Sequence, residues 1–245
     1  LQRTSIGGFL EILSMNQPQN ASYLEMMRCW SLTGWNYSLF NDSAARYKLK
    51  RGTGALVQAM ATDGGFDVML DTSVTSVQQT ANGVMVTTAA GEQVSAKRAV
   101  VTVPLNVLHS VAFDPALNPV KVEASKLKHV GGGAKVFFEV EGDPGAVMTL
   151  SRSTDSALIG SFTYQRGEQR SVLAGFSLEP GALEKPVEYW QPVLEEFVPG
   201  IRLLSTFGHD WGSDALSQGS WCTYRPGTFV RFADELPKRD NNLFF

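Results

Sequence analysis

Cysteine and histidine are scarce in this 245-residue chain, which contains two cysteines and three histidines. Cys29 and Cys222 lie far apart, and such a pair favours a reduced, intracellular protein over one held by a disulfide. The histidines, at positions 109, 129 and 209, show no metal-ligand spacing. We therefore expect neither a disulfide framework nor a zinc site.

Long apolar runs and blocks of one charge are also missing. No uninterrupted apolar stretch reaches the length of about 18 residues that a membrane span needs. The net charge is −3, and the four basic residues in segment 46–51 are more typical of a solvated loop than of a nucleic-acid patch. We therefore expect neither a membrane span nor a nucleic-acid partner.

Two motifs of common enzyme classes are absent. There is no G-x-S-x-G nucleophile elbow. There is also no G-x-G-x-x-G dinucleotide fingerprint, and Gly131-Gly132-Gly133 cannot replace it because that triplet precedes a predicted strand. A phosphate-binding turn needs a strand before it and a helix after it, so the triplet is not expected to hold a phosphate.

The first half of the chain alternates between helical and strand patterns. Apolar residues at helical spacing predict helices over 6–13 and 23–32, and a further helix over 51–65 that ends at Gly64-Gly65. Strands are predicted over 67–70, 74–78 and 84–87, with a hairpin turn at Asn82-Gly83 and another turn at Gly91. The run 99–103, ended by Pro104, predicts a strand buried on both faces.

The second half begins with a predicted helix that contains Val122, Leu127 and His129. The strands expected after it cover 134–140, 147–150, 158–164, 171–178 and 201–207. An amphipathic helix over 187–197 interrupts them, with Pro192 expected in its first turn.

These patterns predict an α/β chain of mixed α+β character. A strand-rich portion, 51–115 and 208–245, is interrupted by an inserted mixed-sheet portion, 116–207, and a helical segment covers 1–50. The chain starts at Leu1 and ends in the apolar run 242–245, which is typical of a strand cut short. We therefore expect a piece of a longer protein.

Three stretches together carry a resemblance to a known family. They are Arg51 to Leu56 with 70–77, Ala99 to Leu108 with 113–115, and His209-Asp210-Trp211 with 219–227. In order and spacing they resemble the central and C-terminal part of the flavin-containing amine oxidases, which include monoamine oxidases, polyamine oxidases and lysine-specific histone demethylases. The resemblance covers about Gly52 to Phe245.

The resemblance implies a fold and a reaction. Segments 51–115 and 208–245 would form part of a FAD-binding domain, and 116–207, with the helical 1–50, a substrate-binding domain. The family oxidises a primary or secondary amine with FAD and passes the electrons to O2, giving hydrogen peroxide. The G-x-G-x-x-G unit, and a Gly-Glu pair that follows the equivalent of 243–245 in the family, are not in this sequence, so the chain would supply only part of a FAD site.

Lys135 and Trp221 are the catalytic candidates. Strand alternation puts Lys135 on a face with Phe137 and Glu139, where a solvent-facing lysine is the alternative. The resemblance implies that this lysine holds a water against flavin N5, and its positive charge would favour reduction of O2. The resemblance also makes Trp221 one wall of an aromatic cage for the amine, with a core aromatic as the alternative and with Tyr224 as a further substrate-binding residue.

The remaining candidates concern the cofactor. Ser220 stands where animal monoamine oxidases carry the cysteine bonded to the flavin, which implies non-covalent FAD. Cys222, which strand alternation would point the same way as Ser220, is the alternative attachment site. The resemblance further implies that the backbone of Val74 binds the adenine and that three residues lie close to the cofactor: Pro104, Leu105 and Trp211.

Other readings stay open at this point. A monoamine-oxidase-like enzyme ranks first, a polyamine oxidase second, and an amino-acid oxidase third, because no arginine is clearly identified for binding a substrate carboxylate. Arg166 and Arg225 are candidates for that role. A catalytically inactive fragment or an interaction module is the alternative from another class. Expected partners are a small amine and O2, a homodimer is left open, and the expected compartment is the cytoplasm or the peroxisome. Four aromatic residues could line a substrate entrance or pack in a core: Trp30, Trp35, Tyr37 and Phe40.

Overall fold

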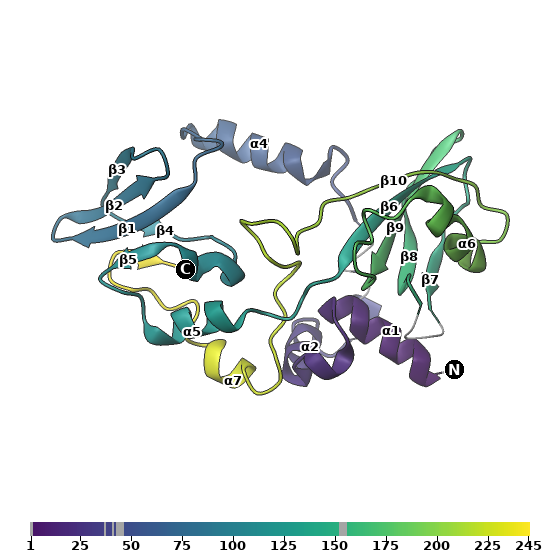
Figure 1. Cartoon of the computed structure of the whole chain (residues 1–245), viewed down its shortest axis with the longest axis horizontal. Helices are drawn as coiled ribbons and strands as arrows, with labels where there is room; N and C mark the ends of the chain where they lie inside the picture. The colour runs from purple at the N-terminus through teal and green to yellow at the C-terminus, as the bar shows by residue number, and fades with distance from the viewer. Residues whose placement is uncertain (1, 37, 41, 43–46, 152–155) are drawn as a thin grey trace. The chain divides into compact units, whose positions relative to one another are not determined.

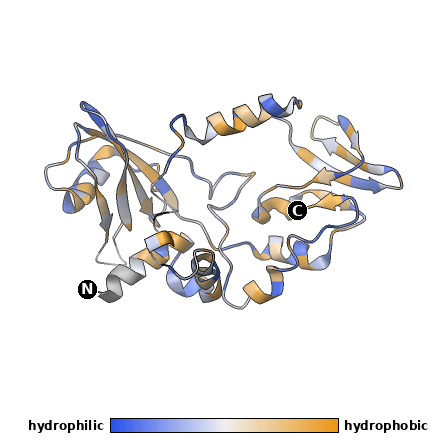
Figure 2. Cartoon of the chain, turned by 180° about the vertical axis from the view of Figure 1, so that it is seen from behind, coloured by the Kyte–Doolittle hydropathy of each residue, from blue (hydrophilic) through white to orange (hydrophobic). Residues whose placement is uncertain are grey.

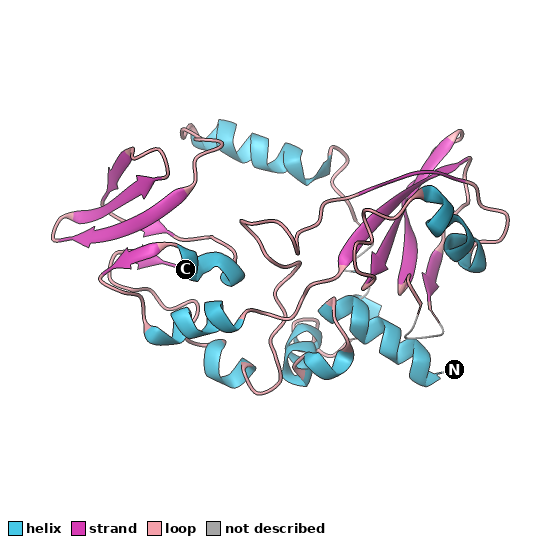
Figure 3. Cartoon of the chain, in the orientation of Figure 1, coloured by secondary structure: helices cyan, strands magenta, loops and turns pink. Residues whose placement is uncertain are grey.

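The computed structural model describes residues 2–36, 38–40, 42, 47–151 and 156–245 (Figure 1). They form two compact units. The first unit consists of 1–22, 101–109 and 118–238, and the second consists of 23–100, 110–117 and 239–245. Helices and strands occur in both units, which confirms the predicted mixed α and β class (Figure 3).

A five-stranded sheet dominates the first unit. Its order is β10-β6-β9-β8-β7, and each neighbouring pair is antiparallel. The strands confirm the five predicted for this region: β6 (Ala134–Glu141), β7 (Met148–Leu150), β8 (Gly160–Gln165), β9 (Arg170–Ser177) and β10 (Leu203–Phe207).

One face of this sheet carries the hydrophobic core. Val136, Phe138 and Val140 alternate along β6 and are fully buried against α6 (Val187–Phe197), which Figure 1 shows beside the sheet. Trp190 of α6 is also fully buried, and its Nε1 donates to the Ala182 carbonyl at 3.1 Å. Burial of such side chains stabilises the unit by about 1.5–3 kcal/mol each. Phe137 and its neighbours lie on the other face of the sheet and do not belong to this core.

The prediction for Pro192 is wrong. α6 begins at Val187, directly after Pro186, so Pro192 lies inside the helix and not in its first turn. The predicted first turn was displaced because Pro186, rather than Pro192, occupies the position before the helix, where no backbone donor is needed.

Short helices complete the first unit. They are α1 (Gln2–Ser14), η1 (Pro18–Asn20), η2 (Leu105–Ser110), α5 (Pro119–Leu127) and α7 (Phe229–Phe232). Asn118 caps α5 by accepting a hydrogen bond from Val120 N at 3.0 Å. The expectation that His129 belongs to this helix is wrong, because Lys128 takes a positive φ of 61° and turns the chain out of the helix.

The described part of the second unit includes the helices α2 (Tyr23–Ser31) and α4 (Gly52–Gly64) and strands that form two sheets. The larger sheet has the order β3-β2-β1-β5, from β1 (Val74–Thr80), β2 (Gly83–Thr88), β3 (Gln93–Ala96) and β5 (Ala112–Asp114), and β4 (Ala99–Val100) pairs in parallel with β11 (Leu243–Phe244). The β1–β2 hairpin confirms the turn predicted at Asn82-Gly83.

Two strand predictions in this unit are wrong. Segment 67–70 has no strand structure, since Val68 and Leu70 are exposed and no described strand pairs with it. The run 99–103 forms a strand only at Ala99–Val100, and Val100 is 71% exposed. A strand is buried on both faces only where a sheet is covered on both sides, and the two-residue pairing with β11 does not provide that.

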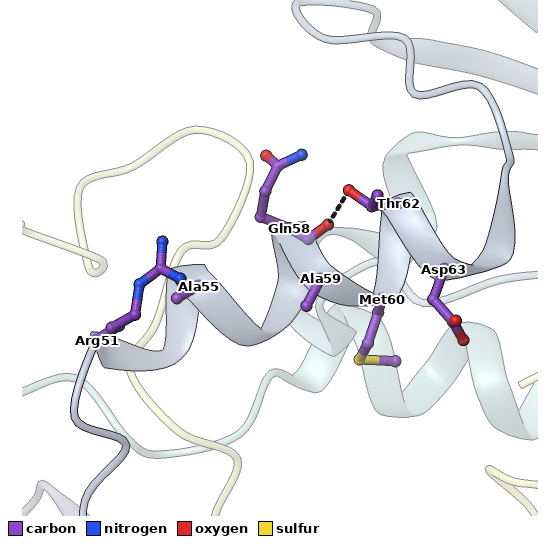
Figure 4. A pocket seen from close by; sticks show the side chains of 7 residues that line it. All are labelled: Arg51, Ala55, Gln58, Ala59, Met60, Thr62 and Asp63. Atoms are coloured by element: carbon purple, nitrogen blue, oxygen red, sulfur yellow. Dashed lines mark hydrogen bonds between the residues drawn. The ribbon is translucent and has the colours of Figure 1, made fainter.

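Helix α4 ends where it was predicted to end, but none of its side chains is buried. Gly65 takes the left-handed conformation at φ 58°, which a glycine adopts without strain, and its N–H donates to Ala61 O. The apolar residues Leu56, Val57 and Met60 are all exposed, and Figure 2 shows the hydrophobic colour along this helix. A shallow pocket runs along α4 (Figure 4), lined by Arg51, Ala55, Gln58, Ala59, Met60, Thr62 and Asp63, and it contains none of the predicted site residues.

The compact units divide the chain differently from the predicted segments at four places. Residues 23–50 and 116–117 belong to the second unit, and 101–109 and 208–238 belong to the first. The assignment of the predicted segments to a cofactor domain and a substrate domain concerns function and stays a prediction. Tyr37 and Arg46, which sequence analysis singled out in an aromatic loop and a basic loop, lie outside the described residues.

Several features of the described part of the chain bear on the excluded classes. None of its helices is both long enough and apolar enough to cross a bilayer. It holds no group of three or more histidine, cysteine, aspartate or glutamate side chains arranged to bind a metal ion. Within that part of the chain neither Cys29 nor Cys222 forms a disulfide.

Candidate functional site

Lys135 lies at the start of β6, on the sheet face opposite the hydrophobic core. Its Nζ is 5.3 Å from the ring centre of Phe176 and 5.8 Å from that of Trp221. Burial lowers the pKa of this amine from its ordinary value. Among the described residues no carboxylate lies within ion-pair distance of Nζ. Lys135 is therefore a half-buried cation that two aromatic rings hold in place and leave able to donate hydrogen bonds.

Trp221 is held by contacts from two directions. Its Nε1 donates to the Leu13 carbonyl of α1 at 2.8 Å. Its ring meets the edge of Phe176 at a centroid distance of 6.2 Å and an interplanar angle of 82°. The residue remains 38% exposed. The indole is thus fixed in orientation and still accessible, which is unusual for a tryptophan that serves only as core packing.

A continuous row of aromatic rings leads along the sheet to Trp221. We call it the aromatic wall, and it consists of Phe137, Phe162, Tyr164, Phe176 and Phe207. Phe137 stacks on Phe207 at 5.2 Å and meets Tyr164 edge-on at 5.3 Å, while Phe162 lies 5.9 Å from Phe176. Strand register produces the row, because paired residues such as Phe137 with Phe207 share a face.

Ser220 lies beside Trp221 in irregular backbone. Its N–H donates to the Gly131 carbonyl at 2.9 Å, and its hydroxyl oxygen is buried with no hydrogen-bond partner among the described residues. Residues 219–222 do not form a strand, so the alternation argument for Cys222 is wrong. The bends at 219–221 leave the Cys222 thiol exposed while the Ser220 hydroxyl is covered.

Sequence reasoning missed a polar pair behind this segment, Asn106 and His129. The Asn106 side chain accepts from His129 N and donates to Gln218 O, each at 2.8 Å. His129 Nδ1 accepts the Gly131 N–H at 3.2 Å. Burial, and secondarily the positive charge of Arg225, lower the pKa of His129 to about 4. The imidazole is therefore neutral at physiological pH, as an acceptor at Nδ1 must be.

The His129 pKa predicts a pH dependence of stability. The native pKa of about 4 lies below the ordinary value of 6.5, so the unfolded chain binds more protons between these two pH values. This contribution is fully present above pH 6.5 and is lost as the pH falls towards 4, and the shift corresponds to about 3 kcal/mol. Urea unfolding at about pH 7 and about pH 4.5 measures it.

The matched variant is His129→Gln. We expect it to lose less stability between the two pH values than the parent protein does, because the titrating group is gone. Equal pH dependence in the two proteins would show that His129 does not titrate as described.

The other predicted residues are placed as follows. Trp211 is 53% exposed and meets the His209 ring at 4.3 Å, and Tyr224 packs edge-on against Phe229 at 5.3 Å. In the same unit Pro104 is exposed, and Leu105 begins η2. Val74 begins β1 in the second unit. The structure thus brings Lys135, Ser220 and Trp221 into one neighbourhood, and it joins Trp211 to it through the hydrogen bond from Gly219 N to Trp211 O.

The two arginines considered for a substrate carboxylate, Arg166 and Arg225, form contacts with other groups of the protein. Arg166 forms a two-pronged ion pair with Asp143, with its Nη2 2.7 Å from the carboxylate. Arg225 Nε donates to the carbonyls of Leu127 and Lys128. Neither guanidinium is aimed at the aromatic wall by these contacts, which weighs against an amino-acid substrate.

Known proteins are similar to this chain over most of its length. Residues 9–245 match the family of flavin-containing amine oxidoreductases. The chain belongs to that family. A pseudooxynicotine dehydrogenase from a Pseudomonas species is 36% identical over 250 residues, which cover 100% of this chain and 50% of that protein. A nicotine dehydrogenase from Pseudomonas putida is 28% identical and covers 100% of this chain and 51% of the relative.

Solved structures agree on the fold of this amine oxidoreductase. Wild-type putrescine oxidase bound to putrescine superposes with a TM-score of 0.67 at 19% identity, over 79% of this chain and 46% of that one. The chain spans about half the length of the curated relatives it matches. The resemblance inferred from the three sequence stretches is thus confirmed at the level of family and fold.

The site residues suit the flavin for which the family is named. The Lys135 ammonium has no carboxylate partner among the described residues, and the buried Ser220 hydroxyl lacks a hydrogen-bond partner there. A polar ring edge could satisfy both, and the exposed face of Trp221 offers an apolar surface beside them. These three residues would hold the isoalloxazine end of the cofactor.

Proposed function

We propose that this chain carries the substrate-facing part of a FAD-dependent enzyme that oxidises a primary or secondary amine. The product imine would hydrolyse to an aldehyde, and O2 would be reduced to hydrogen peroxide. The bound flavin supplies the two-electron chemistry, and the protein supplies binding, orientation and charge. The observation that carries the proposal is the Lys135 amine between Phe176 and Trp221, at one end of the aromatic wall.

Each of the chain's own residues has a defined task in this proposal. Trp221, held by Leu13 O, orients the amine with its exposed ring and excludes water from it. Lys135 holds a water at Nζ and keeps a positive charge where O2 takes up electrons. Ser220 donates its hydroxyl to the cofactor without a covalent bond, and Val74, Pro104, Leu105 and Trp211 are the further cofactor contacts that we propose. Tyr224 is the further residue that we propose to contact the substrate amine.

The aromatic wall favours an amine with one reactive nitrogen and a flat ring. The two relatives described above are named for nicotine and pseudooxynicotine. Flat rings stack on Phe137 and its neighbours, whereas a polyamine needs several carboxylates. On this face of β6 the carboxylates of Glu139 and Glu141 are already paired with Arg170 and Arg202. A monoamine carried on an aromatic ring therefore fits better than putrescine.

Flavin absorbance tests the proposal. The full-length protein, loaded with FAD if it is colourless, should show flavin bands that bleach when a ring-bearing secondary amine is added without oxygen. Readmission of O2 should restore the bands and release hydrogen peroxide. The same experiment with putrescine should give slower bleaching. A full-length protein that stays colourless after refolding with FAD would favour an interaction module over an enzyme.

Non-covalent attachment gives a separate prediction. Precipitating the flavin-loaded protein with acid should release all the flavin into the supernatant, because the Ser220 hydroxyl forms no covalent bond to the ring. A Cys222→Ser variant serves as the control and should behave identically. Flavin that stays in the pellet of the parent protein, but not in that of the variant, would instead make Cys222 the attachment point.

A further inference from the structure

Asn106 connects two chain segments that are distant in sequence. It is 1% exposed, and its carboxamide joins His129 N to Gln218 O. One of these residues precedes the Gly131-Gly132-Gly133 triplet, and the other precedes Gly219, Ser220 and Trp221. Both ends of the carboxamide are used, so neither a shorter side chain nor a carboxylate can make the same pair of hydrogen bonds.

Gly131 lets the two segments cross at close range. A Cβ built on Gly131 would lie 2.2 Å from the Trp221 carbonyl and 2.9 Å from the Ser220 hydroxyl, distances that real Cβ atoms do not show. The Gly131 carbonyl also accepts from Ser220 N, and Val130 N donates to Thr223 O at 3.0 Å. The triplet is therefore a crossing point for the segment that carries Trp221.

The end of α1 closes the arrangement from a third side. Met15 O accepts hydrogen bonds from both Gly132 N and Gly133 N at 3.0 Å, and the Asn16 side chain donates to Val130 O at 2.6 Å. Leu13 O, two residues before Met15, holds the Trp221 indole. Lys135 lies on β6 two residues after the triplet, so one junction governs the positions of both the lysine and the tryptophan.

We propose that Asn106 and Gly131 are positioning residues that set the Trp221 indole against Lys135. Asn106 fixes the distance between residues 129 and 218, and Gly131 fixes how closely the backbone at 220–221 can approach. Neither needs to touch substrate or cofactor. The proposal rests on the proposed function only in that Trp221 is the ring that meets the amine.

The indole N–H signals of nitrogen-15-labelled tryptophan report on this arrangement without any turnover. The chain has five tryptophans. A Trp221→Phe variant identifies the Trp221 signal, and Trp190, whose indole is bonded to Ala182 O in the core, is the internal control for folding. Gly131→Ala is compared with Gly132→Ala, because a Cβ on Gly132 meets only Val130 O at 3.7 Å.

We expect Gly131→Ala to shift the Trp221 signal and to raise its exchange rate with water by about tenfold or more, as the bond to Leu13 O weakens. Gly132→Ala should leave that signal unchanged, and both variants should keep the Trp190 signal. Asn106→Asp, which keeps the side-chain shape but puts an oxygen against Gln218 O, should act like Gly131→Ala and decides the matter if Gly131→Ala does not fold.

The amine assay separates the two levels of the proposal. In an active protein, Gly131→Ala and Asn106→Asp should lower kcat by about tenfold or more and should change KM less. The reason is that a misplaced Trp221 ring no longer orients the bound amine for reaction. An unchanged Trp221 signal in folded Asn106→Asp would overturn the positioning role. A shifted signal in a protein that oxidises no amine would keep the positioning role and reject the proposed function instead.

Discussion

Replacing Lys135 by methionine should slow the reaction of the amine-reduced protein with O2 by about 100-fold or more. Methionine keeps most of the apolar stem between Phe176 and Trp221 but removes the positive charge. Charge develops when O2 takes up electrons, whereas reduction by a neutral amine needs no cation nearby. We therefore expect reduction without oxygen to change by less than about tenfold. Stopped-flow absorbance measures the two steps separately.

Lys185→Met is the matched control for this experiment. The Lys185 ammonium also lies over an aromatic ring, 5.0 Å from the centre of Tyr189, but it is paired with Glu179 and lies away from the aromatic wall. Its replacement should leave both steps unchanged. Equal slowing of reduction and of the reaction with O2 in Lys135→Met would mean that Lys135 positions the amine and does not assist O2.

Replacing Lys121 by methionine should lower the free energy of unfolding by about 3–5 kcal/mol. Lys121 is 1% exposed, and its ammonium donates to the carbonyls of Glu235, Leu236 and Lys238 in the turn after α7. Methionine would remove this buried donor from the Leu236 and Lys238 carbonyls, and each such loss is costly. Urea unfolding followed by fluorescence provides the measurement.

Lys126→Met on the same helix controls for the loss of one charge from α5. Lys126 is exposed, so its replacement should change stability by less than about 0.5 kcal/mol. If Lys121→Met proved equally harmless, the buried ammonium would not be what secures segment 235–238 in the first unit.

Local sequence patterns predicted the elements that hold the site. Alternation along 134–140 gave β6 and put Lys135 and Phe137 on one face of it, as observed. The period of 187–197 gave α6, and Asn82-Gly83 gave a hairpin. These features depend on neighbouring residues only, which is why a sequence reveals them.

Long-range contacts escaped prediction for the same reason. The Asn106 side chain joins residues 23 and 112 positions away, and nothing near Asn106 in the sequence announces that role. The sequence indicated that the Gly131 triplet does not hold a phosphate, but it did not indicate that the backbone at Trp221 packs against Gly131. The strand prediction for 99–103 was wrong because it used residue types that favour strands, whereas the pairing with β11 extends over two residues only.

A crystal structure of the protein with FAD and a slowly oxidised amine bound tests the central claim most directly. The account predicts that the flavin ring lies against Trp221 and within reach of the Lys135 amine, that Ser220 contacts it without a covalent bond, and that the amine's ring rests on the aromatic wall beginning at Phe176. A flavin bound elsewhere, with Lys135 and Trp221 facing solvent, would contradict it.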